Sequence, residues 1–236
     1  MIGHIFSINK NMRDPEEKPF WISFADIMTA LMVLFLFIMS VALLAVTKTV
    51  SQEQKVKQER LHSITVFMDN ISKSVLGYPD VQIDRLHNVV ITGTHFNTNS
   101  SDISHSDGEG LKKLVSAILP VTQTPEAKRW LKRIVVEGYT DQRGTYLFNL
   151  NLSLQRAQRV LCVLFEMPTP DVFTLSPQQD QLVRDLFFVG GYSFNNAKKT
   201  LAESRRVDLR FEFYKFGETP SHQAITTAEN FGHCAI

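Results

Sequence analysis

The hydrophobic residues of this chain form one long continuous block, followed by short periodic groups. From Ile27 to Thr47 the sequence contains no charged residue, no proline and no glycine. As an α-helix this stretch would rise about 31 Å, which matches a hydrocarbon core of about 30 Å. Phe20 and Trp21 stand where an interfacial aromatic belt would fall. The pattern predicts a transmembrane helix over residues 20–47. It is too long for the apolar part of a cleaved signal peptide.

After the apolar block the sequence becomes polar and then periodic. Residues 48–60 (KTVSQEQKVKQER) are strongly polar, and apolar residues then recur at spacings of three and four. This spacing predicts a helical connector over residues 48–80 that ends near Gly77. A stripe of two heptads fits packing on the following domain or a dimeric coiled coil, and we favour packing. Whether residues 48–75 act as a plug stays open. The stripe consists of Leu61, Ile64, Met68, Ile71 and Val75.

From about residue 81 to residue 216, short strand patterns alternate with helical ones. Such interleaving implies an α/β fold in which helices pack on one face of a small mixed sheet. Residues 1–19 form a leader before the membrane segment, and residues 217–236 form a C-terminal tail. The strands are predicted at 81–96 (two short strands), 130–137, 187–189 and 207–213, and the helices at 109–119, 152–165 and 178–186.

Charge and cysteine content exclude some classes of function. The 236 residues carry 25 basic and 24 acidic side chains, a formal net charge of +1. That balance argues against a nucleic-acid binder, which would carry a basic stripe. Cys162 and Cys234 have no metal-binding spacing, and a disulfide between them would fit an oxidising compartment. No zinc-protease motif or nucleophile elbow occurs, so nothing in the sequence supports an enzyme.

One carboxylate, Asp26, lies inside the predicted membrane segment. A charged Asp at the centre of a membrane helix costs about 2.5–3.5 kcal/mol, and less near an end. Asp26 is therefore either an interfacial residue that water can reach or an ion-carrying carboxylate that faces a partner helix, and the residues alone leave both open. Ser23, Asp26 and Ala30 share one helix face, a small polar stripe that suits a path for hydrated ions or protons.

A second candidate site lies in 138-GYTDQRGTYLFNLNLSLQRAQRV-160. Thr140, Asp141 and Asn149 are expected in a turn region after a strand, and Arg156 on the first turns of a helix. A carboxylate and a guanidinium held together can clamp a zwitterion, because one takes an ammonium and the other a carboxylate. The simpler interpretation, which the residues alone favour, is that Asp141 and Asn149 organise turns and Arg156 makes a surface ion pair.

This stretch resembles the signature of the OmpA-like peptidoglycan-binding family. That signature reads Gly-His-Thr-Asp-x-x-Gly, then Tyr-Asn-x-x-Leu-Ser-x-x-Arg-Ala, and its spacing fits from Gly138 to Ala157. The later SRRVDLRFEF resembles the family's closing strand. Tyr139 stands in place of the usual His and Phe148 in place of the usual Tyr, so aromatic character is kept while the hydrogen bonds of those positions are in doubt.

The resemblance implies an OmpA-like domain over residues 81–216 that binds peptidoglycan. It implies that Asp141 and Arg156 grip the amino and carboxyl groups of diaminopimelate in the stem peptide. Thr140, Asn149 and Leu152 match the family's supporting positions, and Phe148 its aromatic one. A domain that reaches the wall must be periplasmic, which makes the leader cytoplasmic.

The membrane segment has a resemblance of its own. WISFADIMTALMVLFLF resembles the MotB family of motor stators, in which Asp26 matches the ion-carrying aspartate. Among such proteins it is most similar to the B subunits of Zorya anti-phage defence systems, and a flagellar stator is the alternative. The resemblance implies a homodimer inside a ring of five MotA-like subunits in the bacterial inner membrane. The transported ion would be a proton, with sodium as the alternative, and no cofactor is implied. A structural tether between membrane and wall is a further alternative.

Overall fold

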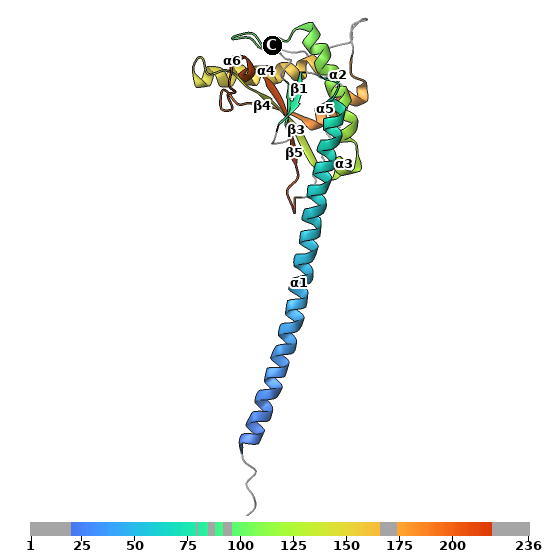
Figure 1. The fold of residues 1–236 in the computed structure, drawn as a ribbon, viewed down its shortest axis with the longest axis vertical. Coiled ribbons are helices and arrows are strands. Elements are labelled where there is room, and N and C mark those ends of the chain that lie inside the picture. Colours follow the sequence, from blue (N-terminus) through green and yellow to red (C-terminus); the bar gives the residue numbers. More distant parts are fainter. Residues whose placement is uncertain (1–19, 79, 85–87, 92–95, 166–173, 219–236) are drawn as a thin grey trace, which may run out of the picture. The chain divides into compact units, whose positions relative to one another are not determined.

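The computed structural model describes residues 20–78, 80–84, 88–91, 96–165 and 174–218, and for residues 20–23 the backbone alone (Figure 1). The predicted leader and all but the first two residues of the predicted tail lie outside this set. The chain divides into two compact units, residues 1–56 and 57–236.

The first unit contains the apolar part of helix α1 (Phe20–Val75), which runs without a break for 56 residues. This helix is long and apolar enough to cross a membrane. Its side chains from Phe24 to Lys55 are exposed. The hydroxyls of Thr29, Ser40 and Thr47 donate to backbone carbonyls three or four residues earlier, at 2.7–2.9 Å. These polar groups are therefore satisfied within the helix, as a hydrocarbon environment requires.

The second unit begins with the last turns of α1, which pack into the hydrophobic core. Met68, Ile71 and Val75 are buried there, whereas Leu61 at the start of the predicted stripe is 61% exposed. Phe67, which the stripe did not include, is also buried and meets the rings of Phe211 and Phe213 edge-on. For residues 67–75 the structure therefore shows the domain-packing arrangement that we favoured.

A five-stranded mixed sheet is the centre of the second unit, in the order β1-β2-β5-β3-β4. β3 pairs in parallel with β4, and the remaining neighbours are antiparallel. The strands are β1 (Val81–Ile83), β2 (Asn88–Ile91), β3 (Leu131–Gly138), β4 (Phe187–Gly191) and β5 (Val207–Phe213).

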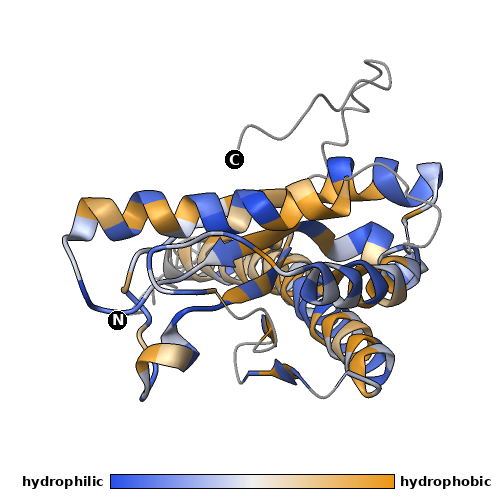
Figure 2. Ribbon diagram, turned by 90° about the horizontal axis from the view of Figure 1, so that it is seen from above, coloured by the Kyte–Doolittle hydropathy of each residue, from blue (hydrophilic) through white to orange (hydrophobic). Residues whose placement is uncertain are grey.

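Helices cover one face of this sheet and charged side chains lie on the other. Ile134, Val136 and Leu209 contribute to the hydrophobic core beneath the helices. Along the same strands the alternate positions carry ion pairs, such as Arg210 Nε with Glu137 Oε1 at 2.9 Å. In Figure 2 the helices of this unit show hydrophobic and hydrophilic residues on the same helix, as amphipathic helices on a sheet do. They are α2 (His105–Thr122), α3 (Pro125–Trp130), α4 (Tyr146–Leu164), α5 (Pro177–Leu186) and α6 (Leu201–Ser204).

Three helix boundaries differ from the sequence-based prediction. α2 begins earlier than predicted, where the Ser104 side chain caps the Asp107 amide. It continues through Pro120 to Thr122, and the proline lies so near the end of the helix that it disrupts little of it. α4 begins six residues before the predicted start, because Thr145 caps the Phe148 amide. The short helices α3 and α6 were not predicted, although threonine caps start both.

Two glycines let α4 lie directly on the sheet. A Cβ at Gly138, the last residue of β3, would stand 1.9 Å from the backbone oxygen of Ser153. A Cβ at Gly191, the last residue of β4, would stand 2.8 Å from the Leu154 amide nitrogen. The helix backbone thus touches the ends of two parallel strands, which fixes the loop between β3 and α4.

We expect Gly138→Ala to destabilise the domain by about 2–4 kcal/mol, because the clash is with backbone and cannot be relieved by a rotamer change. Thermal unfolding of the full chain in detergent measures this. Gly110→Ala is the matched control: it lies within α2 with open space around it, and should raise stability by about 0.5–1 kcal/mol. Equal melting temperatures for the two variants would show that the α4 contact is not tight.

Candidate functional site

The two candidate carboxylates lie in different units and in different environments. Asp26 is exposed on α1, and its carbonyl accepts the Thr29 hydroxyl. Ala30 follows on the same helix face, four residues on, while the Ser23 side chain lies outside the described residues. An exposed carboxylate on an apolar helix needs another protein surface before it can be enclosed in a membrane.

The second carboxylate, Asp141, lies in the loop that joins β3 to α4. Gly144 takes a φ of +95°, a left-handed conformation that favours glycine. The Asn149 amide group, in the first turn of α4, donates to the Arg143 carbonyl at 2.8 Å. The Thr140 amide donates to the Ser193 carbonyl at 2.9 Å, tying the loop to the segment after β4. Thr140, Asp141 and Asn149 are all buried. Thr140 and Asp141 lie in the loop as predicted, whereas Asn149 lies in α4, because that helix begins earlier than the sequence pattern indicated.

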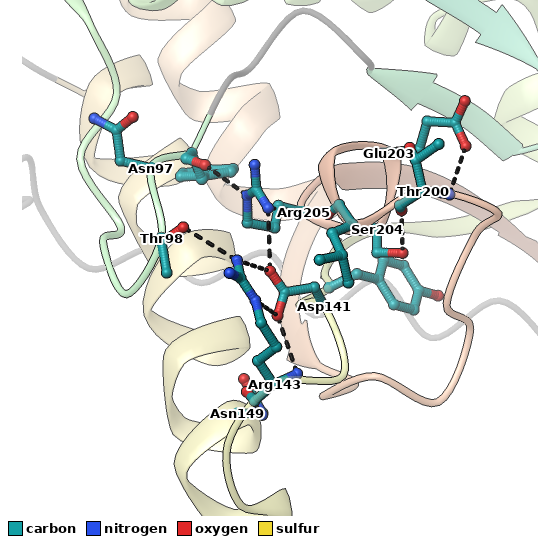
Figure 3. A network of polar contacts seen from close by, with 12 residues as sticks. Asn97, Thr98, Asp141, Arg143, Asn149, Thr200, Glu203, Ser204 and Arg205 are labelled. Carbon is teal, nitrogen blue, oxygen red and sulfur yellow. Dashed lines mark hydrogen bonds and ion pairs between the residues drawn. The ribbon is translucent and has the colours of Figure 1, made fainter.

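Asp141 is surrounded by arginine (Figure 3). Its Oδ1 accepts the Arg143 amide at 3.1 Å and Arg143 Nε at 3.3 Å. Its Oδ2 accepts Arg143 Nη2 at 2.9 Å and Arg205 Nη1 at 3.1 Å. These bonds, foremost those from Arg143, lower the pKa of Asp141 to about 2. The carboxylate is therefore ionised at neutral pH.

Arg156 lies in the middle of α4 and not on the first turns of a helix as predicted, because α4 begins at Tyr146. Its guanidinium donates to the carbonyls of Ser100, Tyr139 and Asn97 at 2.9–3.1 Å. It also stands 4.9 Å from the centre of the Phe96 ring, and 1% of the residue is exposed. Burial, and then the neighbouring Arg205, lower its pKa to about 10, so it remains charged. The simpler alternative of a surface ion pair is wrong, because Arg156 is buried and holds backbone.

The remaining predicted residues frame this turn. Leu152 is buried in α4, and Phe148 is half exposed at the start of the same helix. Thr140 Oγ1 is buried and has no hydrogen-bond partner within the described structure. Tyr139 is buried and donates to Glu137 Oε2 at 2.7 Å, with Arg206 stacked on its ring at 4.3 Å. The ring that replaces the usual histidine is thus built into the charged side of the sheet.

Sequence reasoning did not single out Arg143 and Arg205, which make the closest contacts to Asp141. Arg143 occupies one of the variable positions of the Gly-x-Thr-Asp-x-x-Gly pattern, and Arg205 begins the Arg-Arg-Val segment. A cation two residues after the motif aspartate was the available signal. The described residues contain no cluster of His, Cys, Asp and Glu suited to a metal ion.

Known proteins share features with both units. The family model described as "Membrane MotB of proton-channel complex MotA/MotB" matches residues 8–58. Zorya protein ZorB of Escherichia coli O139:H28 (strain E24377A / ETEC) is 37% identical over 223 residues, covering 91% of this chain and 88% of that protein. The chain belongs to the ZorB family.

Solved structures to which the chain is similar include the OmpA-like domain of FopA1 from Francisella tularensis subsp. tularensis SCHU S4. It is 14% identical, with a TM-score of 0.36, over 57% of this chain and 82% of that one. The periplasmic domain of MotB (residues 64–256) is 20% identical, with a TM-score of 0.36, over 54% and 64% of the two chains. A MotB-like protein from Desulfovibrio vulgaris is 12% identical, with a TM-score of 0.41, over 69% and 99%.

Membership of the ZorB family indicates the kind of complex to which the two candidate sites belong. Homology to ZorB and MotB supports a stator-like B subunit of a Zorya or motor complex, and these homologues are not enzymes. It also fits an inner-membrane protein that crosses the bilayer once, through α1. The roles of Asp26 and of the residues around Asp141 remain predictions.

We expect Arg156→Ala to destabilise the domain by about 3 kcal/mol or more, because three carbonyls would lose their charged donor. Thermal unfolding of the full chain measures this, with Gln158→Ala on the exposed side of α4 as control. Arg156→Lys should fall between them, since an ammonium cannot reach all three carbonyls. If Arg156→Ala melts like the control, the contacts to Ser100, Tyr139 and Asn97 contribute little to the fold.

Proposed function

We propose that this protein is the wall-anchored stator subunit of a proton-driven rotary motor in the bacterial inner membrane, acting in anti-phage defence. The observation that supports the proposal is that one ZorB-family chain combines a carboxylate on an apolar helix of membrane-spanning length with a carboxylate–guanidinium cluster on an α/β domain. Either feature alone could be explained without a motor function. A rotary motor needs both, because it requires an ion pathway in the membrane and a fixed anchor outside it.

In the membrane, Asp26 is the proton carrier. Two copies of the chain pair, and their α1 helices stand inside a ring of five MotA-like subunits, which encloses the carboxylate. Neutralising a carboxylate in a low-dielectric site removes a large desolvation cost, so uptake and release of a proton change which contacts the helix prefers. The leader lies in the cytoplasm and the C-terminal domain in the periplasm. Sodium is the alternative ion.

At the wall, Asp141 receives the amino group of diaminopimelate in a peptidoglycan stem peptide. Asn149 and Thr140 hold the loop through their hydrogen bonds, Leu152 is buried in the same helix as Asn149, and the half-exposed ring of Phe148 lies next to Gly144. Arg156 fixes the Asn97–Ser100 loop beside the site and supplies positive charge near the ligand carboxylate. A direct grip by Arg156 would require that loop to move, because the guanidinium is buried.

Two other functions use the same parts. A flagellar-type stator would share the ion pathway and the anchor, and the MotB match over residues 8–58 favours it as the second candidate. A purely structural tether would need the wall site alone and would leave Asp26 without a role. The Asp26 variants below separate the tether from either motor.

We expect Asp26→Asn to abolish proton flux and phage protection while the protein still inserts and assembles, since an amide cannot carry a proton. Flux is measured with a pH-sensitive dye in vesicles that contain the chain and its membrane partner. Asp26→Glu, which keeps a carboxylate, should retain part of both activities. Full protection by the Asp26→Asn variant would favour the tether.

We expect Asp141→Asn to weaken binding to purified sacculi about ten- to hundredfold, the range for losing a charge-assisted hydrogen bond. Co-sedimentation of the detergent-solubilised full chain measures this. Asp185→Asn makes the same charge change on α5 and serves as the control. Sacculi whose stem peptides carry lysine in place of diaminopimelate test whether the ligand's own carboxylate matters.

A further inference from the structure

The Asp141 carboxylate has no vacant acceptor position in the free domain. An ionised carboxylate offers about four lone-pair sites. Two are taken on Oδ1, by the Arg143 amide and Nε, and two on Oδ2, by Arg143 Nη2 and Arg205 Nη1. A ligand ammonium that binds Asp141 must therefore replace a donor that is already there.

The donors differ in how firmly they are held. Arg205 has a side chain 21% exposed and also donates to the carbonyls of Phe96 and Leu201. The Arg143 side chain is 54% exposed, against 7% for that of Asp141. Beyond Asp141, its guanidinium bonds within the described residues to the Thr98 hydroxyl, at 3.2 Å. The Arg143 guanidinium is thus the outermost and most loosely held donor.

The Arg143–Asp141 ion pair has a specific geometry. Nε and Nη2 of Arg143 approach the two oxygens of Asp141 side by side, the forked arrangement in which guanidinium and carboxylate match best. In Figure 3 the Arg143 side chain rises from below to the Asp141 carboxylate, and Arg205 reaches the same carboxylate from above. The backbone amide of Arg143 also bonds Oδ1, so the loop keeps its shape when the side chain leaves.

We propose that Arg143 caps the ligand-binding carboxylate of this domain and sets its affinity, because wall binding requires the Arg143 guanidinium to leave Asp141. The proposal rests on the proposed role of Asp141 in wall binding. Arg143 competes with the ligand ammonium for the same two oxygens, so the measured affinity is reduced by the fraction of molecules in which the cap is closed.

The cap predicts an effect of opposite sign to that of losing the site. Arg143→Ala should bind diaminopimelate-containing sacculi about three- to tenfold more tightly than the unaltered chain, the range for releasing a partly exposed ion pair. Less free meso-diaminopimelate should then be needed to saturate the site, measured by titration of the detergent-solubilised full chain. Arg143→Lys, which keeps the charge but loses the fork, should lie between them.

A matched control separates the cap from the general loss of a positive charge. Arg129→Ala removes an arginine that is equally exposed, at 53%, and that lies before the opposite end of β3, where it pairs with Glu59. Its affinity should equal that of the unaltered chain. Melting temperatures of both variants confirm that the domain is folded.

Each outcome decides between the two proposals. If Asp141→Asn loses binding and Arg143→Ala gains it, both stand. If Asp141→Asn loses binding while Arg143→Ala weakens it or leaves it unchanged, wall binding through Asp141 stands and the cap is overturned, with Arg143 a ligand contact in the first case. If Asp141→Asn binds normally, Asp141 is not the ammonium site and both are wrong.

Discussion

The close contact between α4 and the ends of β3 and β4 is the constraint on which the rest of the site depends. At Gly138 a strand and a helix backbone meet with no room for a Cβ. The chain leaves β3 at that contact, turns through Asp141, and re-enters α4 at the Thr145 cap. Because the helix lies this close to the sheet, Arg156 reaches the Tyr139 carbonyl and donates to it. A helix a few ångströms farther away would leave the turn without that support.

The two candidate carboxylates, Asp141 and Asp26, have opposite electrostatic surroundings. Asp141 is ionised because hydrogen bonds from Arg143 and Arg205 hold its pKa far below neutral pH. Asp26 has no cation within hydrogen-bonding distance along the described part of α1, and the apolar residues that follow it offer none. A group surrounded by permanent cations cannot work as a proton carrier. A group in an apolar helix can, once a partner encloses it, so the environment divides the proposed roles between binding and transport.

The pattern of apolar and polar residues predicted most of the fold. The hydrogen bonds of the site were harder to predict, because several donors compete for the same acceptors. The apolar block, the stripe after it and the alternation of Val207–Phe213 were enough to predict α1 and β5. The start of α4 was missed because the asparagines and leucines after Thr145 show no clean apolar period, whereas the cap decides the boundary. Asp141 and Arg156 were candidates from their residue types and spacing, and the family pattern assigned their roles. The hydrogen bonds of Asp141 to Arg143 and of Arg156 to three carbonyls were not predicted. Motif spacing indicates which residues lie near one another, but not which donor pairs with which acceptor.

The balance of charge at the site bears on what it can recognise. Three guanidinium groups, from Arg143, Arg156 and Arg205, lie near one carboxylate, so the local potential is positive although Asp141 is the group that we propose binds the ammonium. If Asp141 takes an ammonium as proposed, a simple amine would approach against that potential and gain one ion pair. A ligand that carries its own carboxylate beside the amine would satisfy both signs, because its negative group meets the arginines. Discrimination for a zwitterion over a plain amine therefore follows from the excess of arginine, and not from the aspartate alone.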